Sequence, residues 1–445
     1  MNSDSAQDFI NRLPPEIIMD IFSKCCSERY SLQDSMAIHL SGAVCSRWRT
    51  LALSMPELWA SFSIKIAGLA SAGFGAANSS RNDIIALSRL LHLHLERSAN
   101  CPLSFDVSFD KSDMSPALSD LLAVLLEHSE RWSSVKLPYS HAFASIYARL
   151  RGRLGRLETL ELTLNGVLDS TDNCFEDTPQ LRRLALGTSL PRKMPLPRNQ
   201  LTVLHLGAAP TMEFFQFMTL GPCPHLTTLI LNPYYPLKLP TIPQTLPALI
   251  RLHTLILAIR DGFSPNPIID CLDILTAPSL EHLDILGRRE IQLPPQTFES
   301  FLERSGCTLR TLTITFKDNL PFHTLQRNLR ALSSLTHFTI FTSGKEGGVV
   351  DRILHSLTQS DVTVGCLLPN LISFELQAAK FHPAVVNLAA SRLVSGPKCA
   401  RLEKLILHDI PHTQAACERL KSFREQGMLV SYLPRCKPCR NALFI

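Results

Sequence analysis

A repeated leucine motif constrains the fold of this chain more than any other feature. The pattern L-x-x-L-x-L, with conservative replacements, occurs ten times from residue 157 onward. The steps between copies run from 20 to 36 residues and are mostly in the twenties, within the range of solenoid repeats. The copies begin at Leu157, Leu181, Leu201, Leu226, Leu252, Leu280, Leu309, Leu335, Leu371 and Leu402.

The alternation inside each copy predicts a β-strand. The last two leucine positions alternate with variable residues, so one strand face turns inward and the other outward. One copy cannot bury its apolar face alone, whereas stacked copies form a parallel sheet over a continuous core. Connections with helical spacing, at 294–306 and 385–396, would form the convex side. The spacing therefore predicts an α/β leucine-rich-repeat solenoid, a horseshoe with a parallel sheet.

The region upstream of residue 151 follows a looser version of this organisation. Strand-like alternation occurs at 58–66 and 102–109, and helical period at 82–98 and 117–130. We interpret 58–150 as irregular α/β first repeats that cap the array. The remaining boundaries are a disordered N-terminus at 1–10, a helical motif at 11–57, the repeat array at 151–433 and a tail at 434–445.

Composition excludes several classes of protein. A net charge of +5 spread over 445 residues does not indicate nucleic-acid binding. No secretory signal and no apolar run long enough to span a bilayer occurs, so no membrane association is expected. Thirteen cysteines without a framework spacing predict free thiols in a reducing compartment. We therefore expect an intracellular chain, in the cytoplasm, the nucleus or both.

No pattern in the sequence assembles an active site. Cys436 and Cys439 have the spacing of half a zinc site, without a second pair of ligands. His92 and His94 lie two apart on an expected helix, so they face different sides, and both are expected at the surface. We predict no catalytic residues, no metal and no cofactor, and conclude that the chain is not an enzyme.

The first sixty residues do not follow the repeat. Helical spacing occurs in LPPEIIMDIFSKCC and again in MAIHLSGAVCSRWRTLALSM, which Pro56 ends. Two short helices cannot cover both apolar faces by themselves. They either dock on the first repeat as a cap or present an apolar patch to a partner protein.

The residues of this segment resemble a known motif. LPPEIIMDIF at 13–22, VCSRWRTLA at 44–52 and PELW at 56–59 look like the F-box, and the last is similar to a form abundant in fungal F-box proteins, many of which carry divergent leucine-rich repeats. The segment CCSERYSLQDSMAIHLSGA departs from the usual compact middle of that motif.

The resemblance implies a non-enzymatic substrate receptor of a Skp–cullin–F-box ubiquitin ligase. Its adaptor-binding residues would be Leu13, Pro14, Pro15, Ile17, Ile18, Ile21, Phe22, Val44, Trp48 and Leu51, some of which must instead hold the F-box together. A target protein, which the sequence does not identify, would bind the concave strand positions Glu161, Arg183, His205, Asp284, His337, Glu375 and Lys404. The alternative is a leucine-rich-repeat scaffold whose N-terminal helices only cap the horseshoe.

Overall fold

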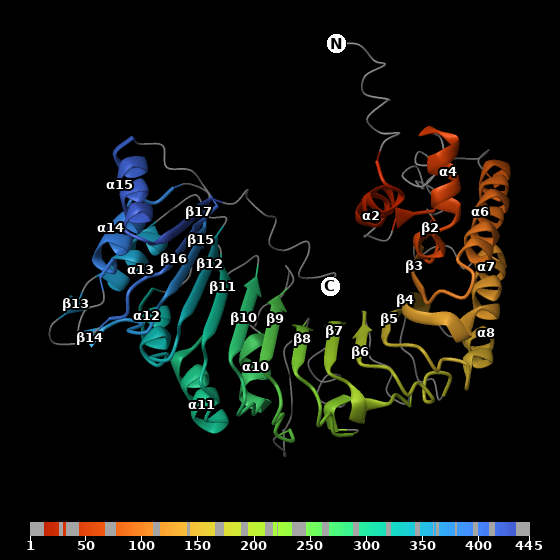
Figure 1. Ribbon diagram of the computed structural model, residues 1–445. Coiled ribbons are helices and arrows are strands. Elements are labelled where there is room, and N and C mark those ends of the chain that lie inside the picture. Colours follow the sequence, from red (N-terminus) through yellow and green to blue (C-terminus); the bar gives the residue numbers. More distant parts are fainter. Residues whose placement is uncertain are drawn as a thin grey trace, which may run out of the picture. The chain divides into compact units, whose positions relative to one another are not determined.

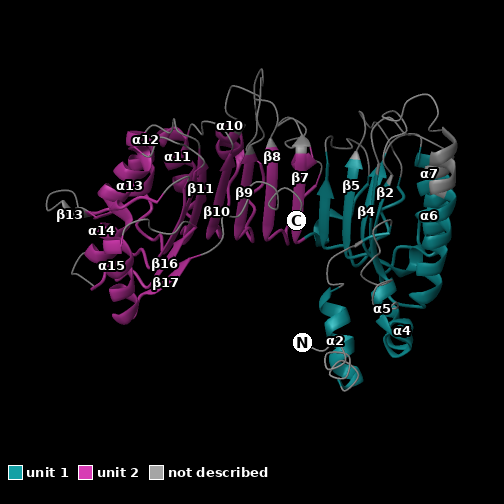
Figure 2. Ribbon diagram, turned by 90° about the horizontal axis from the view of Figure 1, so that it is seen from above, with its two compact units in different colours: residues 1–201 teal, residues 202–445 magenta. Residues whose placement is uncertain are grey.

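A computed structural model of the chain divides into two compact units, Met1–Leu201 and Thr202–Ile445, which are described separately (Figure 2). The structure describes residues 13–25, 30–32, 44–66, 77–109, 116–139, 143–164, 173–187, 195–209, 217–219, 221–233, 246–259, 267–287, 293–316, 322–342, 348–358, 360–361, 365–378, 381–394, 399–408 and 414–432. The predicted segments 1–10 and 434–445 lie outside these ranges.

Unit 1 begins with short helices and continues as alternating strands and helices. Its elements are α2 (Pro15–Cys25), β1 (Tyr30–Ser31), α4 (Ser46–Leu53), α5 (Pro56–Trp59), β2 (Ser61–Ile66), α6 (Ala77–Arg97), β3 (Leu103–Phe109), α7 (Pro116–Glu127), η2 (Ser129–Arg131), β4 (Trp132–Tyr139), α8 (Ala144–Tyr147), η4 (Ala148–Leu150), β5 (Thr159–Leu164), β6 (Arg183–Leu186) and η5 (Arg198–Gln200).

The strands of unit 1 form a parallel sheet in the order β1-β2-β3-β4-β5-β6. Helices α6 and α7 lie along one side of this sheet (Figure 1). Aromatic side chains fill the core at neighbouring strand positions: Phe62 stacks on Phe105, and Phe105 meets Trp132 edge to face. Large rings at equivalent positions bury much apolar area, so these irregular repeats still have a continuous core.

Unit 2 repeats one strand and one connection several times. Its elements are β7 (Val203–Ala209), β8 (Thr228–Pro233), β9 (Thr254–Ile259), α10 (Pro267–Ile274), β10 (His282–Gly287), α11 (Pro295–Ser305), β11 (Thr311–Phe316), α12 (Phe322–Arg330), β12 (His337–Thr342), α13 (Gly348–Thr358), β13 (Ser360–Asp361), β14 (Gly365–Cys366), β15 (Ser373–Gln377), α14 (Ala384–Ser391), β16 (Lys404–Leu407), α15 (Gln414–Glu425) and β17 (Leu429–Tyr432).

The sheet of unit 2 is parallel and open, in the order β7-β8-β9-β10-β11-β12-β15-β16-β17, with α10–α15 along one side (Figure 1). The repeat leucines occupy equivalent positions, so that Leu204, Leu229 and Leu255 are adjacent in register and fully buried. The connection at 294–306 forms α11, which ends at Gly306 with φ +60°, a left-handed position that glycine adopts without strain.

The predicted fold class, short N-terminal helices followed by an α/β solenoid with a parallel sheet, is confirmed. The helices expected at 82–98, 117–130 and 385–396 are present as α6, α7 and α14. The domain boundaries stay predictions; the division between the units falls within the predicted array. Among the described helices, none combines the length and the apolar character needed to cross a bilayer.

The expectation of free thiols is wrong for two cysteines. Cys366 and Cys399, 33 residues apart in sequence, form a disulfide. The partners come from different connections of the last repeats, so their pairing depends on the fold. Sequence spacing alone gives no sign of it. Eight other described cysteines are not in a disulfide.

Candidate functional site

The N-terminal helix α2 has one buried and one exposed apolar side. Pro15 occupies its first turn, and the Pro14 carbonyl accepts hydrogen bonds from the backbone N–H groups of Ile17 and Ile18. Ile18 and Phe22 lie one helical turn apart and are buried, with 0% and 2% of their surfaces exposed. Ile17, on the other side, is 47% exposed.

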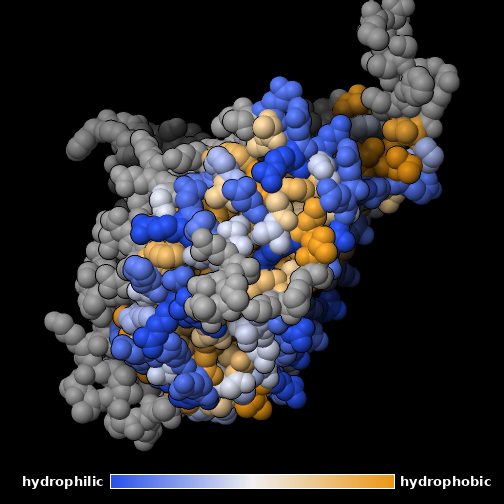
Figure 3. Space-filling view, turned by 90° about the vertical axis from the view of Figure 1, so that its left-hand side faces the viewer, coloured by the Kyte–Doolittle hydropathy of each residue, from blue (hydrophilic) through white to orange (hydrophobic). Residues whose placement is uncertain are grey.

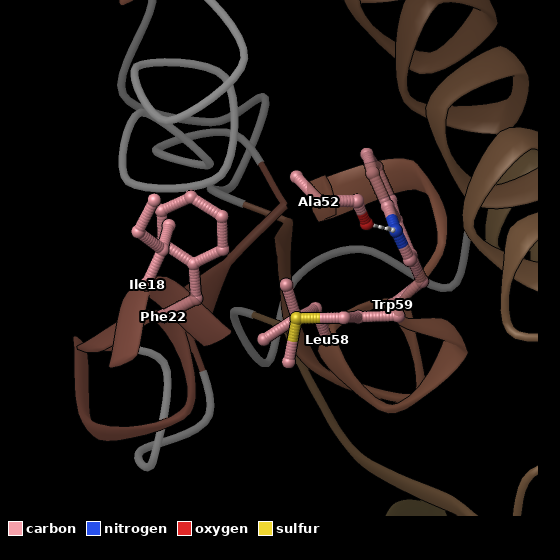
Figure 4. Packing of buried hydrophobic residues seen from close by; sticks show 6 residues of the cluster. Ile18, Phe22, Ala52, Leu58 and Trp59 are labelled. Atoms are coloured by element: carbon pink, nitrogen blue, oxygen red, sulfur yellow. Dashed lines mark hydrogen bonds between the residues drawn. The ribbon is translucent and has the colours of Figure 1, made fainter. Parts of the chain in front are cut away.

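Helices α4 and α5 supply the surface on which Ile18 and Phe22 pack. The buried cluster, drawn in Figure 4, joins α2 to both helices and contains Ile18, Phe22, Ala52, Met55, Leu58 and Trp59. The Trp59 indole N–H donates to the Ala52 carbonyl at 3.0 Å. Arg47 on α4 donates to the Leu13 carbonyl at 2.6 Å. The three helices therefore form a small core with polar ties between them.

The ten residues predicted to bind an adaptor fall into three groups. Ile18 and Phe22 belong to the core and are closed to a partner. Leu13, Trp48 and Leu51 are half-buried and pack against that core. Ile21 is also half-buried but is not among the residues packed on it. Four are exposed: Pro14, Pro15, Ile17 and Val44. We call these four exposed residues the exposed apolar patch.

The F-box-resembling segment also contacts helix α6 and strand β2, which we call the first repeat. Trp59 of α5 meets the His94 ring of α6 edge to face at 5.0 Å, and the Arg97 guanidinium lies 4.4 Å from the Trp59 ring centre. Residues 30–31 form β1, which pairs with β2, and the Leu32 N–H donates to the Ser63 carbonyl. Docking therefore involves α5 and β1, whereas Ile17 and Val44 stay uncovered among the described residues.

The prediction of a surface position is wrong for His94. Its side chain is fully buried, in ring contact with Trp59 and Phe62, whereas His92 is exposed. His94 faces inward because α6 packs on the sheet along the side that carries Leu87, Leu91 and His94. It thus forms part of the joint between α5 and the first repeat.

In unit 2, strand register brings five predicted target-binding residues into two rows that run across the strands. His205, Asp284 and Glu375 occupy one row, which also contains Ile230, Ile256, Thr313, Thr339 and Ile406. His337 and Lys404 belong to a row two residues earlier, with His282, Thr311 and Ser373. We call these the second row and the first row. Both alternate with the buried leucines.

Hydrogen bonds tie the acidic members of the second row to their neighbours. Glu375 accepts from the His408 ring at 2.7 Å. Burial raises the pKa of Asp284, while a hydrogen bond from Thr313 and the charge of His282 oppose this rise. Burial, with the nearby charges of Lys404 and His282, lowers the pKa of His337. These groups form a mixed-charge surface.

The two predicted residues of unit 1 have different surroundings. Glu161 on β5 forms an ion pair with Lys136 on β4 at 2.7 Å, and register also places Asp106 beside Lys136. Arg183, at the start of β6, is exposed and lies next to Thr159 in register. The sheet of unit 1 thus presents a charged row, with Lys136 and Asp106 added to the predicted set.

Two features of these surfaces are missing from the predicted set. Ile256 is a half-buried apolar member of the second row, whereas Ile230 and Ile406 of that row are buried. The signal for all three is the isoleucine between the last two leucines of their motifs. Lys136 lies on a strand upstream of the regular copies, where no motif marks it. Within the described residues, no group of three or more His, Cys, Asp or Glu side chains could hold a metal ion. Cys436 and Cys439 lie outside them.

Residues 10–65 match the family model described as F-box-like, which spans α2, β1, α4, α5 and most of β2. No curated protein matches the chain. The match coincides with the small helical core and includes all ten residues predicted to bind an adaptor. An F-box-like domain points to an adaptor or receptor role rather than to an enzyme. This chain therefore carries an F-box-like domain at residues 10–65.

Proposed function

We propose that the chain is a substrate receptor of a Skp–cullin–F-box ubiquitin ligase, in which the exposed apolar patch binds a Skp-type adaptor. The observation that carries this proposal is the coincidence of the F-box-like match with a helical core that leaves Ile17 and Val44 about half exposed, at 47% and 54%. Exposed apolar side chains on a small domain favour burial by a partner. The adaptor would link the chain to a cullin.

The alternative role, a cap on the first repeat, explains why α5 and β1 are packed against it. It does not explain why the apolar side chains of the patch are exposed. A cap covers the end of the core with its own apolar side chains and turns polar residues outward. Trp59 and Leu32 meet that description, because both are buried. Ile17 and Val44 do not. We infer that this segment both closes the first repeat and binds the adaptor.

A binding measurement with matched variants tests the adaptor proposal. The double variant Ile17→Asp and Val44→Asp should lose binding to a purified Skp-type adaptor, because it places two charges in the interface. The control is Ile85→Asp with Ile250→Asp, which changes two isoleucines of similar exposure, 46% and 57%, outside the patch. Binding that survives the first pair, or equal loss in both, would contradict the proposal, as would no binding by the native chain.

We further propose that a target protein binds the first and second rows of unit 2. Exposed strand positions in a solenoid are where partners bind. The first row exposes His337 and Lys404, and the second row adds the half-buried Ile256 beside Asp284. A photo-crosslinker at Thr339 should label the target, whereas one at Ile85 on α6 should not. The labelled protein must then be ubiquitylated in a reconstituted ligase reaction that the Ile17→Asp and Val44→Asp variant does not support.

This role requires the chain to share a compartment with cullin ligases, and we propose the cytoplasm or the nucleus. Fractionation of cells that express the tagged chain, with a co-precipitated cullin as the marker, tests the location. Recovery of the chain in a fraction that lacks the cullin would contradict it.

A further inference from the structure

The disulfide in unit 2 links the connections that lead into two neighbouring strands. Cys366 is the last residue of β14 and precedes β15, while Cys399 lies between α14 and β16. The Cα atoms are 6.3 Å apart, within the range that a disulfide spans without backbone movement. Cys366 and Cys399 are both half-buried.

A buried cation lies against one of the two sulfurs. Arg392, which follows α14, is 1% exposed, and its Nη2 group donates to Cys366 Sγ at 3.2 Å. Its other hydrogen bonds go to the carbonyl oxygens of Leu357, Leu367 and Leu368. All of these acceptors are uncharged while the disulfide is intact. Burial of the guanidinium lowers the pKa of Arg392 to about 10, which reflects the cost of this arrangement.

Reduction of the disulfide would place a thiol beside that guanidinium. A thiolate on Cys366 would supply the negative charge that the buried cation lacks, so the charged form is favoured there. A thiolate that forms readily is also the better leaving group in thiol–disulfide exchange. The two cysteines are therefore unequal: Cys366 should both attack and leave, while Cys399 should carry the transient adduct during reduction.

We propose that Cys366 and Cys399 form a redox-active site that exchanges with small-molecule disulfides of the glutathione class. In oxidation, the Cys366 thiolate attacks one sulfur of the small disulfide, forms a mixed disulfide and releases one small thiolate. The Cys399 thiolate then attacks the Cys366 sulfur and releases the second. The two protons of the protein thiols end on the two small thiols, which balances the two-electron oxidation of the protein.

The state of this site controls how firmly β15 and β16 are joined where they begin. Beside the disulfide, the Ala400 N–H donates to the Pro369 carbonyl at 2.7 Å, and the Lys404 N–H donates to the Ile372 carbonyl at 3.0 Å. The oxidised form holds these segments together. The reduced form lacks this covalent link. Ser373 and Lys404 of the first row, which pair in register, lie at the start of these two strands.

Two full-length variants test the inequality of the cysteines. Cys399→Ser and Cys366→Ser each keep one sulfur, and both are exposed to the same concentration of oxidised glutathione. Peptide-resolved mass spectrometry follows the adduct. Cys366 should be glutathionylated about tenfold faster than Cys399, given the dependence of exchange rates on thiolate fraction. Equal rates, or faster modification of Cys399, would overturn the proposal.

The native chain provides a second measurement that does not depend on how the variants fold. Oxidised protein is treated with reduced glutathione and quenched early with acid. The transient adduct should be on Cys399, because Cys366 leaves. An adduct mainly on Cys366, or a pair that stays reduced at every glutathione ratio, would overturn the proposal. Oxidation should also slow amide hydrogen exchange in β15 and β16, and unchanged exchange there would refute the control of strand joining.

Discussion

The F-box-like domain and the last repeats of unit 2 differ in what they bury. The domain leaves the apolar side chains of Ile17 and Val44 about half exposed. The last repeats instead bury polar groups and satisfy them: His382 with Asp351 at 2.9 Å, and Arg392 with three carbonyl oxygens. Uncovered apolar surface indicates a partner still to bind, whereas satisfied buried polar groups favour a single rigid packing.

The largest effect is expected where the domain meets the first repeat. Trp59→Ala removes a ring that packs in the core, against His94 and beneath Arg97, and should lower the free energy of unfolding by about 3–5 kcal/mol. Chemical denaturation measures the loss, and Trp59→Phe, which keeps most of the apolar volume, should lose less. A loss of stability below about 1 kcal/mol would mean that α5 is not packed firmly against α6.

A smaller loss is expected at the buried cation of the last repeats. Arg392→Met keeps much of the side-chain volume but leaves buried carbonyl oxygens without donors, which should cost about 2–3 kcal/mol. Denaturant unfolding of the oxidised chain measures this cost. Arg327→Met is the control, because Arg327 forms an exposed pair with Glu299 and should hardly matter. Equal effects would remove the distinction between buried and exposed polar groups.

A pH-dependent effect is expected in the second row. Burial raises the pKa of Asp284 above its ordinary value of 3.8, so the folded chain binds this proton more tightly and loses stability as pH rises through the folded pKa. Asp284→Asn should therefore be more stable than the native chain above that pKa, and the gain should vanish below pH 3.8. Denaturation at several pH values checks this. A gain for Asp284→Asn that does not change with pH would contradict the prediction.

The smallest effect on stability is expected in the exposed apolar patch. Ile17→Ala should change the free energy of unfolding by less than about 0.5 kcal/mol, because the exposed side chain makes few packing contacts that truncation would remove. Ile18→Ala, the adjacent change in the core, should cost about 2–4 kcal/mol. Thermal and chemical denaturation of the two variants measure the contrast. Similar losses would show that Ile17 is buried and would remove the patch from the proposed adaptor site.

Period and spacing predict the repeat strands well, because each copy satisfies the same alternation in its own six residues. They do not predict which of Ile17 and Ile18 is buried, because both fit the apolar pattern of the helix. Packing of α2 on α4 and α5 decides that Ile18 is the buried one. The burial of His94 could not be predicted for a similar reason, because it depends on contact with Trp59 of another helix. The pairing of Cys366 with Cys399 and the two-residue strand β1 also depend on contacts between distant segments.

The short strand β1 has a consequence for how the protein behaves at high concentration. Without it, β2 would be the first strand of its sheet and would offer a row of unpaired backbone groups to any other extended chain. β1 has only two residues and pairs with Phe62 and Ser63, so it covers part of this edge of β2. We expect β1 to hinder strand addition at Phe62 and Ser63, and deletion of residues 30–32 should make the chain more prone to self-association.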